Sequence, residues 1–253
     1  MTLTLAQWHQ RYQQQARWTQ NLRTHLYQKC GIQQAARILD VGCGTGILEM
    51  ELSGISSASA FAIDLDLEAL KFSRANAPKS IITVGDGLYL PYTRASFEVV
   101  LCHFLLLWIN HAELALDEMV RVTKPDGFVL ALAEPDYGGR IDFPPELSQI
   151  GVWQNEALME QGANPFIGRQ LLSIFSKAGL VDIEVGILGA QWGKNISDQD
   201  FEMEWQVLAS DLSSNQEFTL HADEIKSLFL SSHKAQQRIL FVPVFYAFGK
   251  VHR

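Results

Sequence analysis

The stretch "ILDVGCGTGILEM", residues 38–50, decides the fold. An apolar run typical of a buried strand ends at Asp40, and glycines follow at alternate positions, Gly42, Gly44 and Gly46. We expect a helix directly after them. A strand, a glycine-rich turn and a helix N-terminus bring backbone N–H groups and the positive end of a helix dipole to one spot. The missing side chains therefore indicate that a ligand approaches the backbone there.

Strand and helix patterns alternate through the first half of the chain. Strands are predicted at 36–41, 58–66, 80–86, 97–103 and 128–134, and helices at about 47–54, 67–77 and 111–123. Asp66 is expected to cap the second of these helices and Pro78 to end it, while "KPDG" at 124–127 is expected to be a turn. This alternation predicts a parallel sheet covered by helices on both faces.

The two ends of the chain are mainly helical in pattern. Aromatic and leucine side chains at helical spacing predict one or two amphipathic helices over 5–29. Further helices are predicted at 145–162, 167–178, 199–211 and 221–236, and strands at 181–190 and 239–251. Pro243 removes a donor from the last strand, which should therefore contain a bulge or an unpaired position.

Composition limits the class of protein. The 253 residues are 47% apolar and 19% charged, which is typical of a globular protein with a sizeable core, and the net charge of −8 argues against nucleic-acid partners. The N-terminus lacks a signal-peptide pattern, and the longest apolar run, 99–109, is too short to cross a bilayer. Cys30, Cys43 and Cys102 show no metal or redox spacing. We expect a cytoplasmic protein with no membrane partner and no metal site.

The glycine spacing distinguishes between two cofactor families. Dinucleotide enzymes use GxGxxG, whereas this loop is GxGxG, and Asp40 before it would suit a cationic ligand. The loop resembles the first motif of class I S-adenosylmethionine-dependent methyltransferases. The resemblance continues in the right order through "FAIDLD", "VGDGLYLP", "SFEVVLCHFLLLWI" and "RVTKPDGFVLALAEPD", and it covers about 35–135.

The resemblance implies an α/β fold: a Rossmann-like, seven-stranded, mostly parallel sheet with an antiparallel last strand. It further implies one methyltransferase domain over 1–253. Within it, 1–30 would form an N-terminal helical lid and 35–135 the cofactor-binding core. Residues 136–253 would supply helical insertions over the acceptor side and the last two strands.

The resemblance also assigns contacts to the cofactor, S-adenosyl-L-methionine. Gly42 would let the backbone reach the methionine moiety, and Asp40 would face its ammonium group through water. Gly44 and Gly46 would let the loop pass beneath the ligand. Asp64 would accept both ribose hydroxyls, because a carboxylate only accepts hydrogen bonds.

The remaining cofactor contacts come from other motifs. Asp86 would accept from the adenine amino group, Gly87 and Leu88 would lie beside the ring, Leu65 follows Asp64, and the Cys102 backbone would pass near the sulfonium.

The lid would contribute three further contacts. Tyr12, Arg17 and Trp18 would fold over the ligand and exclude water, and Arg17 would pair with the methionine carboxylate. An ordinary packed surface helix is the alternative.

The implied reaction is an in-line displacement at the methyl carbon of the sulfonium. A hydroxyl or amine acceptor needs a base, whereas an ionised carboxylate does not. "CHFL" replaces the Asn/Asp-Pro-Pro-aromatic motif of amide and base-amino methyltransferases, and the cysteines and Asp136 are too few for arsenic or metal-dependent catechol chemistry. We expect methylation of a small molecule or a short apolar peptide, at a hydroxyl or carboxylate oxygen.

Two side chains are proposed as catalytic. His103 follows the fourth strand and Tyr137 follows the fifth, at the edge where α/β sheets bind ligands. Asp136 and Arg140 could also contact the acceptor. Arg140 would suit an acceptor that carries a carboxylate, which its guanidinium could bind through two hydrogen bonds. A structural histidine and an ordinary turn are the alternatives.

Aromatic residues of the second half could line an acceptor pocket, although we expect only about a third of them to do so. They are Trp153, Phe166, Trp192, Phe201, Trp205, Phe245 and Tyr246.

Two other functions stay open. One is a non-catalytic S-adenosylmethionine-binding module of a larger biosynthetic system. The other is a nicotinamide-dependent oxidoreductase, which the glycine spacing and Asp86 disfavour.

Overall fold

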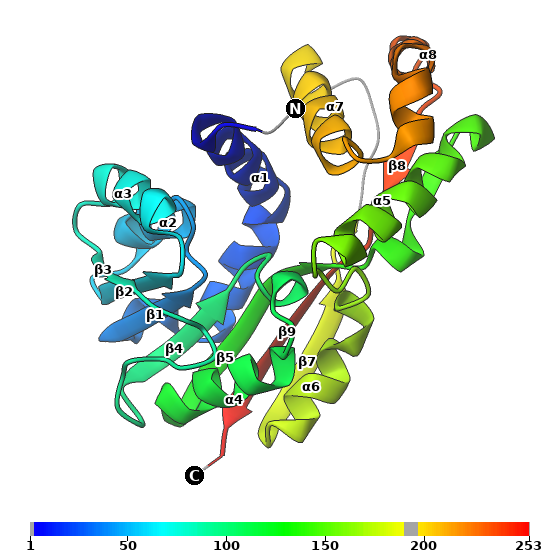
Figure 1. Cartoon of the computed structure of the whole chain (residues 1–253). Helices are drawn as coiled ribbons and strands as arrows, with labels where there is room; N and C mark the ends of the chain where they lie inside the picture. The colour runs from blue at the N-terminus through cyan, green and yellow to red at the C-terminus, as the bar shows by residue number, and fades with distance from the viewer. Residues whose placement is uncertain (1–2, 190–196, 253) are drawn as a thin grey trace.

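The structure, a computed structural model, describes residues 3–189 and 197–252 and is built on a seven-stranded sheet (Figure 1). The strand order is β3-β2-β1-β4-β5-β9-β7. The strands are β1 (Arg37–Val41), β2 (Ser59–Asp64), β3 (Ile81–Val84), β4 (Phe97–Cys102), β5 (Thr123–Pro135), β7 (Leu180–Ile187) and β9 (Val244–Val251). Only β9 runs antiparallel to its neighbours, β5 and β7. The predicted mostly parallel sheet with an antiparallel last strand is confirmed.

Helices cover both faces of the sheet. The α-helices are α1 (Leu5–Lys29), α2 (Ile47–Ile55), α3 (Leu67–Asn76), α4 (Ala112–Val122), α5 (Ser148–Glu160), α6 (Leu171–Lys177), α7 (Asp198–Asp211) and α8 (Gln216–Lys234). Short 3-10 helices are η1 (Ile32–Gln34), η2 (Leu106–Trp108), η3 (Tyr137–Gly139), η4 (Pro145–Leu147) and η5 (Gly168–Gln170). Helices α4 and α6 pack on one face, and α1 and α2 pack on the other. Both layers remove the apolar strands from water, as the sequence pattern requires.

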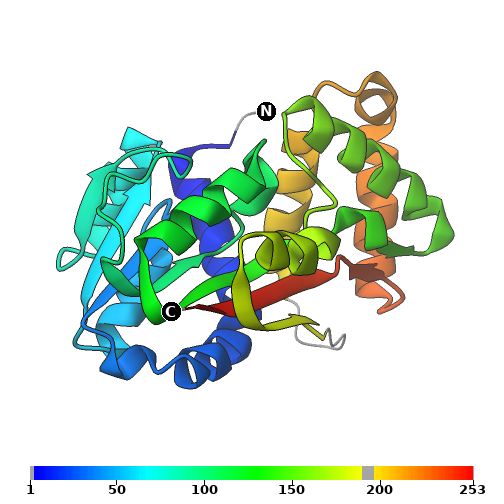
Figure 2. The same ribbon diagram turned by 90° about the horizontal axis from the view of Figure 1, so that it is seen from below.

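Three helices of the second half form a helical cap at one end of the molecule. Helices α5, α7 and α8 gather at the end of the molecule opposite α2 and α3 in both ribbon views (Figures 1 and 2). A two-stranded sheet of β6 (Ile141–Phe143) and β8 (Ile239–Phe241) joins this end. The cap has its own apolar cluster, which includes Phe201, Trp205 and Phe229. The second half therefore builds helices around a separate core beside the sheet.

Two sequence predictions for strands were wrong in detail. The expected turn at 124–127 lies within β5, where Phe97 pairs with Thr123 but Val99 already pairs with Phe128. These four residues bulge out of the ladder, and Asp126 adopts the left-handed conformation at φ 64°. The predicted strand 239–251 is divided into β8 and β9, which belong to different sheets. The break falls at 242–243, as the missing Pro243 donor allows.

A buried carboxylate joins β5 to the segment after β4. Glu134 is fully buried, and its Oε1 accepts from the backbone N–H groups of Leu105 and Leu106, both at 3.0 Å. Its Oε2 accepts from the N–H of Leu107 at 3.2 Å. These donors begin η2 and have no partner within the helix. Glu134 therefore fixes the turn that carries Phe104 and Leu105 towards the carboxyl edge of the sheet.

Replacing Glu134 by Ala should lower the free energy of unfolding by about 2–3 kcal/mol, because three buried N–H groups lose their acceptor. Glu134→Gln, which keeps one acceptor oxygen, should lose less. Urea unfolding followed by circular dichroism measures both, with the exposed Glu156→Gln on α5 as control. A Glu134→Ala protein as stable as the parent would contradict this role.

Candidate active site

The glycine loop between β1 and α2 needs left-handed backbone at three positions. The φ angles of Gly42, Gly44 and Gly46 are +75°, +52° and +84°. A Cβ at Gly42 would lie 2.5 Å from Leu105 Cδ1, and a Cβ at Gly46 would lie 2.5 Å from Ser73 Oγ. Two of the three glycines therefore accommodate the protein's own packing. At Gly44 a Cβ would meet no clash, and its nearest neighbour would be the Tyr12 ring of α1 at 3.5 Å.

The loop is held by the carboxylate at the end of β2. Asp64 Oδ2 accepts from the Gly44 N–H at 2.8 Å, and its Oδ1 accepts from the Asp66 N–H at 2.9 Å. Asp66 in turn caps α3, as predicted, by accepting from Glu68 and Ala69. Each oxygen of Asp64 keeps a lone pair for another donor.

A cavity of about 350 Å³ lies between α1, the glycine loop and the segment after β4. Seven of the side chains and glycines proposed from the sequence line it: Tyr12, Asp40, Gly42, Gly44, Asp64, His103 and Tyr137. They come from parts of the chain that are more than 120 positions apart (Tyr12 to Tyr137). The structure thus brings together the core of the predicted cofactor site with both proposed catalytic residues.

Other proposed cofactor contacts do not line this cavity. They are Gly46, Leu65, Asp86, Gly87, Leu88 and Cys102. Leu65 is 67% exposed, and the Asp86 carboxylate accepts from the Leu88 N–H at 2.9 Å. Cys102 is fully buried in β4. Their assignments stay predictions; those after β2 and β3 lie at the same carboxyl edge as Asp64.

The N-terminal helix α1 covers the loop. His9 Nδ1 is 2.9 Å from Thr45 Oγ1, and the His9 ring is 4.7 Å from that of Phe72 on α3. Tyr12 lies over Gly44, and burial raises the pKa of its hydroxyl to about 12. Helix α1 therefore contacts both the glycine loop and α3.

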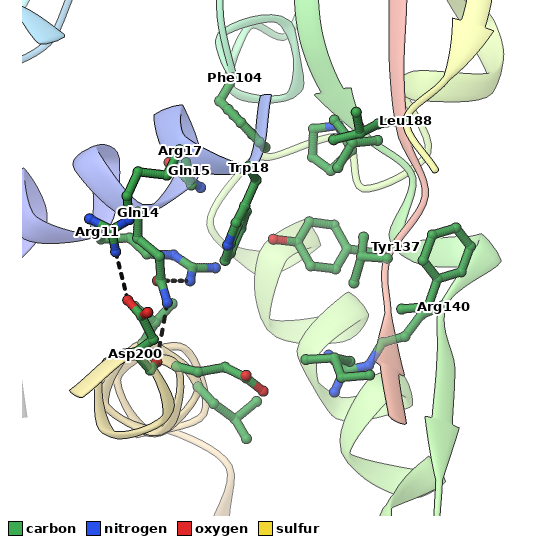
Figure 3. Close-up of a pocket in the computed structure, with 18 of the residues that line it drawn as sticks. Arg11, Gln14, Gln15, Arg17, Trp18, Phe104, Tyr137, Arg140, Leu188 and Asp200 are labelled. Atoms are coloured by element: carbon green, nitrogen blue, oxygen red, sulfur yellow. Dashed lines mark hydrogen bonds and ion pairs between the residues drawn. The ribbon is translucent and has the colours of Figure 1, made fainter. Parts of the chain in front are cut away.

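Arg17 and Trp18 face a second cavity instead. Arg17 forms an ion pair with Asp200 on α7 at 2.7 Å, and Trp18 lies 4.7 Å from the Arg11 guanidinium. This cavity has a volume of about 630 Å³ and lies between α1, α7 and the ends of β5, β8 and β9. Figure 3 shows the Tyr137 hydroxyl pointing into it towards α1.

The two cavities adjoin, since six residues line both. They are Arg11, Gln15, Phe104, Pro135, Tyr137 and Val207. Phe104 has a left-handed φ of 54°, a strained conformation that is often found at functional sites. A ligand in the first cavity would therefore meet a ligand in the second beside these residues.

Arg11 was missed by sequence reasoning, which selected Arg17. The guanidinium of Arg11 donates to Gln14 Oε1 at 2.6 Å. In the described part of the chain no carboxylate lies within ion-pair distance of Arg11. Burial lowers the pKa of Arg11, and the charges of Glu204, Asp211 and other neighbours raise it. No sequence signal separates the two arginines, because both lie on the same predicted helix.

The other charged residues proposed from the sequence after β5, Asp136 and Arg140, are paired, and of these two only Arg140 lines the second cavity. Arg140 donates to Asp142 at 2.6 and 2.8 Å, and Asp136 accepts from Arg169 at 2.5 and 2.6 Å. These contacts support the alternative that Asp136 and Arg140 hold the segment after β5 together, although Arg140 still lines the cavity.

The expected aromatic lining was wrong for the residues that the structure describes. Trp153, Phe201 and Trp205 belong to the core of the cap. Neither cavity is lined by Phe166, Phe245 or Tyr246. Helix α7 turns its aromatic residues towards α5 and α8, so they fill the cap core. Trp192 lies outside the described residues.

His103 contacts α1, the helix that the sequence predicted as a lid. Its Nε2 lies 2.9 Å from Thr19 Oγ1, and Thr19 in turn accepts from the buried Arg23, which pairs with Glu51. Burial and the Arg23 charge lower the pKa of His103 to about 3. The imidazole is therefore neutral near neutral pH and is a weak base, which favours the alternative of a structural histidine.

Two negative findings concern the described residues only. Between residues 3–189 and 197–252, no helix is long and apolar enough to span a membrane. In the same ranges no three His, Cys, Asp or Glu side chains cluster in a way that could hold a metal ion.

Comparison with known proteins gives consistent matches. The family described as a methyltransferase domain matches residues 39–131. A demethylmenaquinone methyltransferase of Renibacterium salmoninarum is 33% identical over 47% of this chain and 51% of its own length. A malonyl-acyl-carrier-protein O-methyltransferase of Erwinia pyrifoliae is 33% identical over 44% of this chain and 45% of its own. The chain thus spans about half the length of these relatives.

The fold has a similar match. A Haemonchus contortus phosphoethanolamine N-methyltransferase 2, solved with S-adenosyl-L-methionine, superposes with a TM-score of 0.59. The sequences are 18% identical, and the match covers 93% of this chain and 52% of that one. At this identity the likeness concerns the fold alone.

The resonances of the His103 imidazole should not titrate between about pH 5 and 8, since its pKa is about 3. Two-dimensional NMR of histidine side chains tests this, with the His103→Gln variant assigning the signals. A midpoint near the ordinary value of about 6.5 would contradict the burial argument and would restore His103 as a candidate base.

Proposed function

The chain belongs to the class I S-adenosylmethionine-dependent methyltransferases, and we propose that it transfers a methyl group from S-adenosyl-L-methionine to an oxygen atom of a small acceptor molecule. One observation carries the proposal: the cavity at the glycine loop, with Asp40 and Asp64, opens beside Arg11 and Tyr137 into a second, larger cavity. Two adjoining cavities suit a reaction between two bound molecules.

The residues of the first cavity fit the cofactor. Asp40 is 2% exposed, and its Oδ1 has no partner within the described residues, so a cation could complete it. Asp64 retains acceptor capacity for paired hydroxyls, and at Gly44 the loop carries no side chain between its backbone and the Tyr12 ring. A sulfonium nucleoside with an amino-acid tail presents these groups: a cationic end, a ribose and a flat base.

Each residue has a role in this proposal. Asp40 faces the ammonium group, Asp64 binds the ribose, and the Gly44 backbone supports the ligand from below. Tyr12 and His9 hold α1 over the loop, which excludes water. The cofactor supplies an activated methyl group bonded to a cationic sulfur, and the protein positions the acceptor in line with it.

Arg11 is the group that we propose for acceptor recognition. It lies at the junction of the cavities, beside the Tyr137 hydroxyl, for which the structure gives no hydrogen bond in the described ranges. Burial raises the pKa of Tyr137, so the hydroxyl is a donor near neutral pH. A guanidinium that no carboxylate contacts among the described residues and a phenolic donor suit an anionic oxygen, such as a carboxylate.

A carboxylate acceptor also agrees with the weak bases at the site. His103 is directed to Thr19, and Tyr137 is protonated. An acceptor that is already ionised needs no proton removed before it attacks the methyl carbon. Methylation at a hydroxyl and methylation of a short apolar peptide stay predictions. The charged residues that line the second cavity support them less than they support a carboxylate acceptor.

The two alternative functions differ from the proposed one in the cofactor that is bound or in whether it reacts. A nicotinamide-dependent oxidoreductase would bind a dinucleotide. A non-catalytic module would bind S-adenosyl-L-methionine and never form S-adenosylhomocysteine with any acceptor.

Asp64→Ala should weaken binding of S-adenosylhomocysteine by about 10–100-fold, because hydrogen bonds to a charged acceptor are lost. Isothermal titration calorimetry measures this, with the exposed Asp117→Ala on α4 as control. NAD serves as the competing ligand. Binding of NAD alone, or equal affinity of the Asp64→Ala protein and its parent for S-adenosylhomocysteine, would refute the cofactor assignment.

Arg11→Met should lower turnover of carboxylate acceptors by about 10-fold or more and leave the affinity for S-adenosylhomocysteine unchanged. The assay follows S-adenosylhomocysteine formed from S-adenosyl-L-methionine with a panel of carboxylic acids, phenols and amines. Arg17→Met is the matched control, since Arg17 lies on the same helix and cavity but is paired with Asp200. Loss of cofactor affinity instead would assign Arg11 to the methionine carboxylate.

A further inference from the structure

A second carboxyl group, that of Glu49, neighbours Asp40 and does not line the cavity. Glu49 is in the first turn of α2 and is 0% exposed, and neither of its oxygens finds a partner in the described part of the protein. Besides burial, the charge of Glu49 raises the pKa of Asp40, so the two carboxyl groups are close neighbours. Two carboxyl groups can share a hydrogen bond only when at least one of them carries a proton.

The surroundings of this pair contain no cation that neutralises it. Across residues 3–189 and 197–252 no ion pair reaches Asp40 or Glu49. The nearby Arg23 on α1 is already engaged by Glu51, by Thr19 and by the carbonyl oxygen of Ala16. A buried acidic pair without a cation is unfavourable unless it is partly protonated or a cationic ligand completes it.

The other titratable groups around the pair come from four elements. They are Asp64 on β2, Cys43 in the glycine loop, Cys102 on β4 and Tyr27 on α1. Burial raises the pKa of Cys43, Cys102 and Tyr27, so these three stay neutral near neutral pH. Asp64 is the one other carboxylate facing the pair, and it is held by backbone N–H groups.

We propose that Glu49 is a positioning residue for the cofactor, whose shared proton holds Asp40 towards the cavity and sets the charge that Asp40 offers to a cationic ammonium group. The inference rests on the proposed function. Asp40 lines the cavity, whereas Glu49 does not, so Glu49 acts on the ligand only through Asp40.

Protonation of the pair should change near neutral pH. Burial raises the pKa of both carboxyl groups, that of Glu49 to about 7. Below that pH the pair holds two protons and is neutral; above it the pair holds one shared proton and one negative charge. A bound ammonium group favours the charged form. Ligand binding should therefore release a proton below neutral pH, and the affinity should rise as the pH increases.

The test is calorimetric titration of S-adenosylhomocysteine at about pH 6 and about pH 8, a measurement that needs no acceptor. For the parent we expect about 10-fold weaker binding at the lower pH, because only about a tenth of the pairs are charged there. In two buffers of different ionisation enthalpy at about pH 6, the observed heat should differ by close to one released proton.

Glu49→Gln separates positioning from a structural role. The amide still donates to Asp40 but does not titrate, so the pH dependence should disappear and the variant should bind more tightly than the parent at about pH 6. A merely structural role would weaken binding at every pH. Glu68→Gln on α3, an exposed carboxyl, is the matched control and should keep the slope of the parent.

Asp40→Asn provides a second variant in case Glu49→Gln does not fold, as judged by its thermal unfolding. It should bind weakly at both pH values and without a slope. A slope that persists in either variant, or its absence in the parent, would overturn the inference while leaving the proposed function intact. Failure of the parent to bind S-adenosylhomocysteine at any pH would instead contradict the proposed function.

Discussion

The site depends on one hydrogen bond, from the Gly44 N–H group to the Asp64 carboxylate. This bond joins the loop after β1 to the end of β2 and holds the left-handed backbone that Gly42, Gly44 and Gly46 make possible. Both ends of the bond lie at the carboxyl edge of a parallel sheet, where the strand order reverses between β1 and β4. Because the loop is fixed there, Asp40 and Asp64 face the same cavity, and the positive end of α2 lies beside them.

Helix α1 is both a part of the core and the cover of the site. Its last turns pack under the sheet through Leu26 and Tyr27, and its first turns cross the glycine loop through His9 and Tyr12. The buried Arg23 lies between these halves and, with Thr19 and Glu51, connects them to His103 and α2. Removing one partner of such a buried charge pair costs about 3–5 kcal/mol. The cover is therefore anchored more firmly than a surface helix would be.

Charge is distributed unevenly over the two cavities. Around the larger one the carboxylates of Asp200, Glu204 and Asp142 are each paired with an arginine, which leaves Arg11 as the cation without a contacting carboxylate among the residues described. At the smaller one, which Arg11 also lines, no ion pair reaches Asp40 or its neighbour Glu49 in the described part of the chain. The acidic residue of the smaller cavity and the arginine at the junction agree with the proposed cationic cofactor and the proposed anionic acceptor.

The sequence alone determined the alternation of strands and helices in the first half, the glycine loop and the cap at Asp66, because these follow from local hydrophobic periodicity and turn chemistry. It also indicated the carboxylates Asp40 and Asp64, since a polar residue that ends a buried strand is visible in the pattern. Only the tertiary structure decided that Arg11 rather than Arg17 faces the junction, that Glu49 neighbours Asp40, and that the aromatic residues of α7 fill a core. Which side of a helix meets a cavity depends on packing partners that can lie far away in the chain, as α7 does from α1. Local periodicity carries no information about such partners.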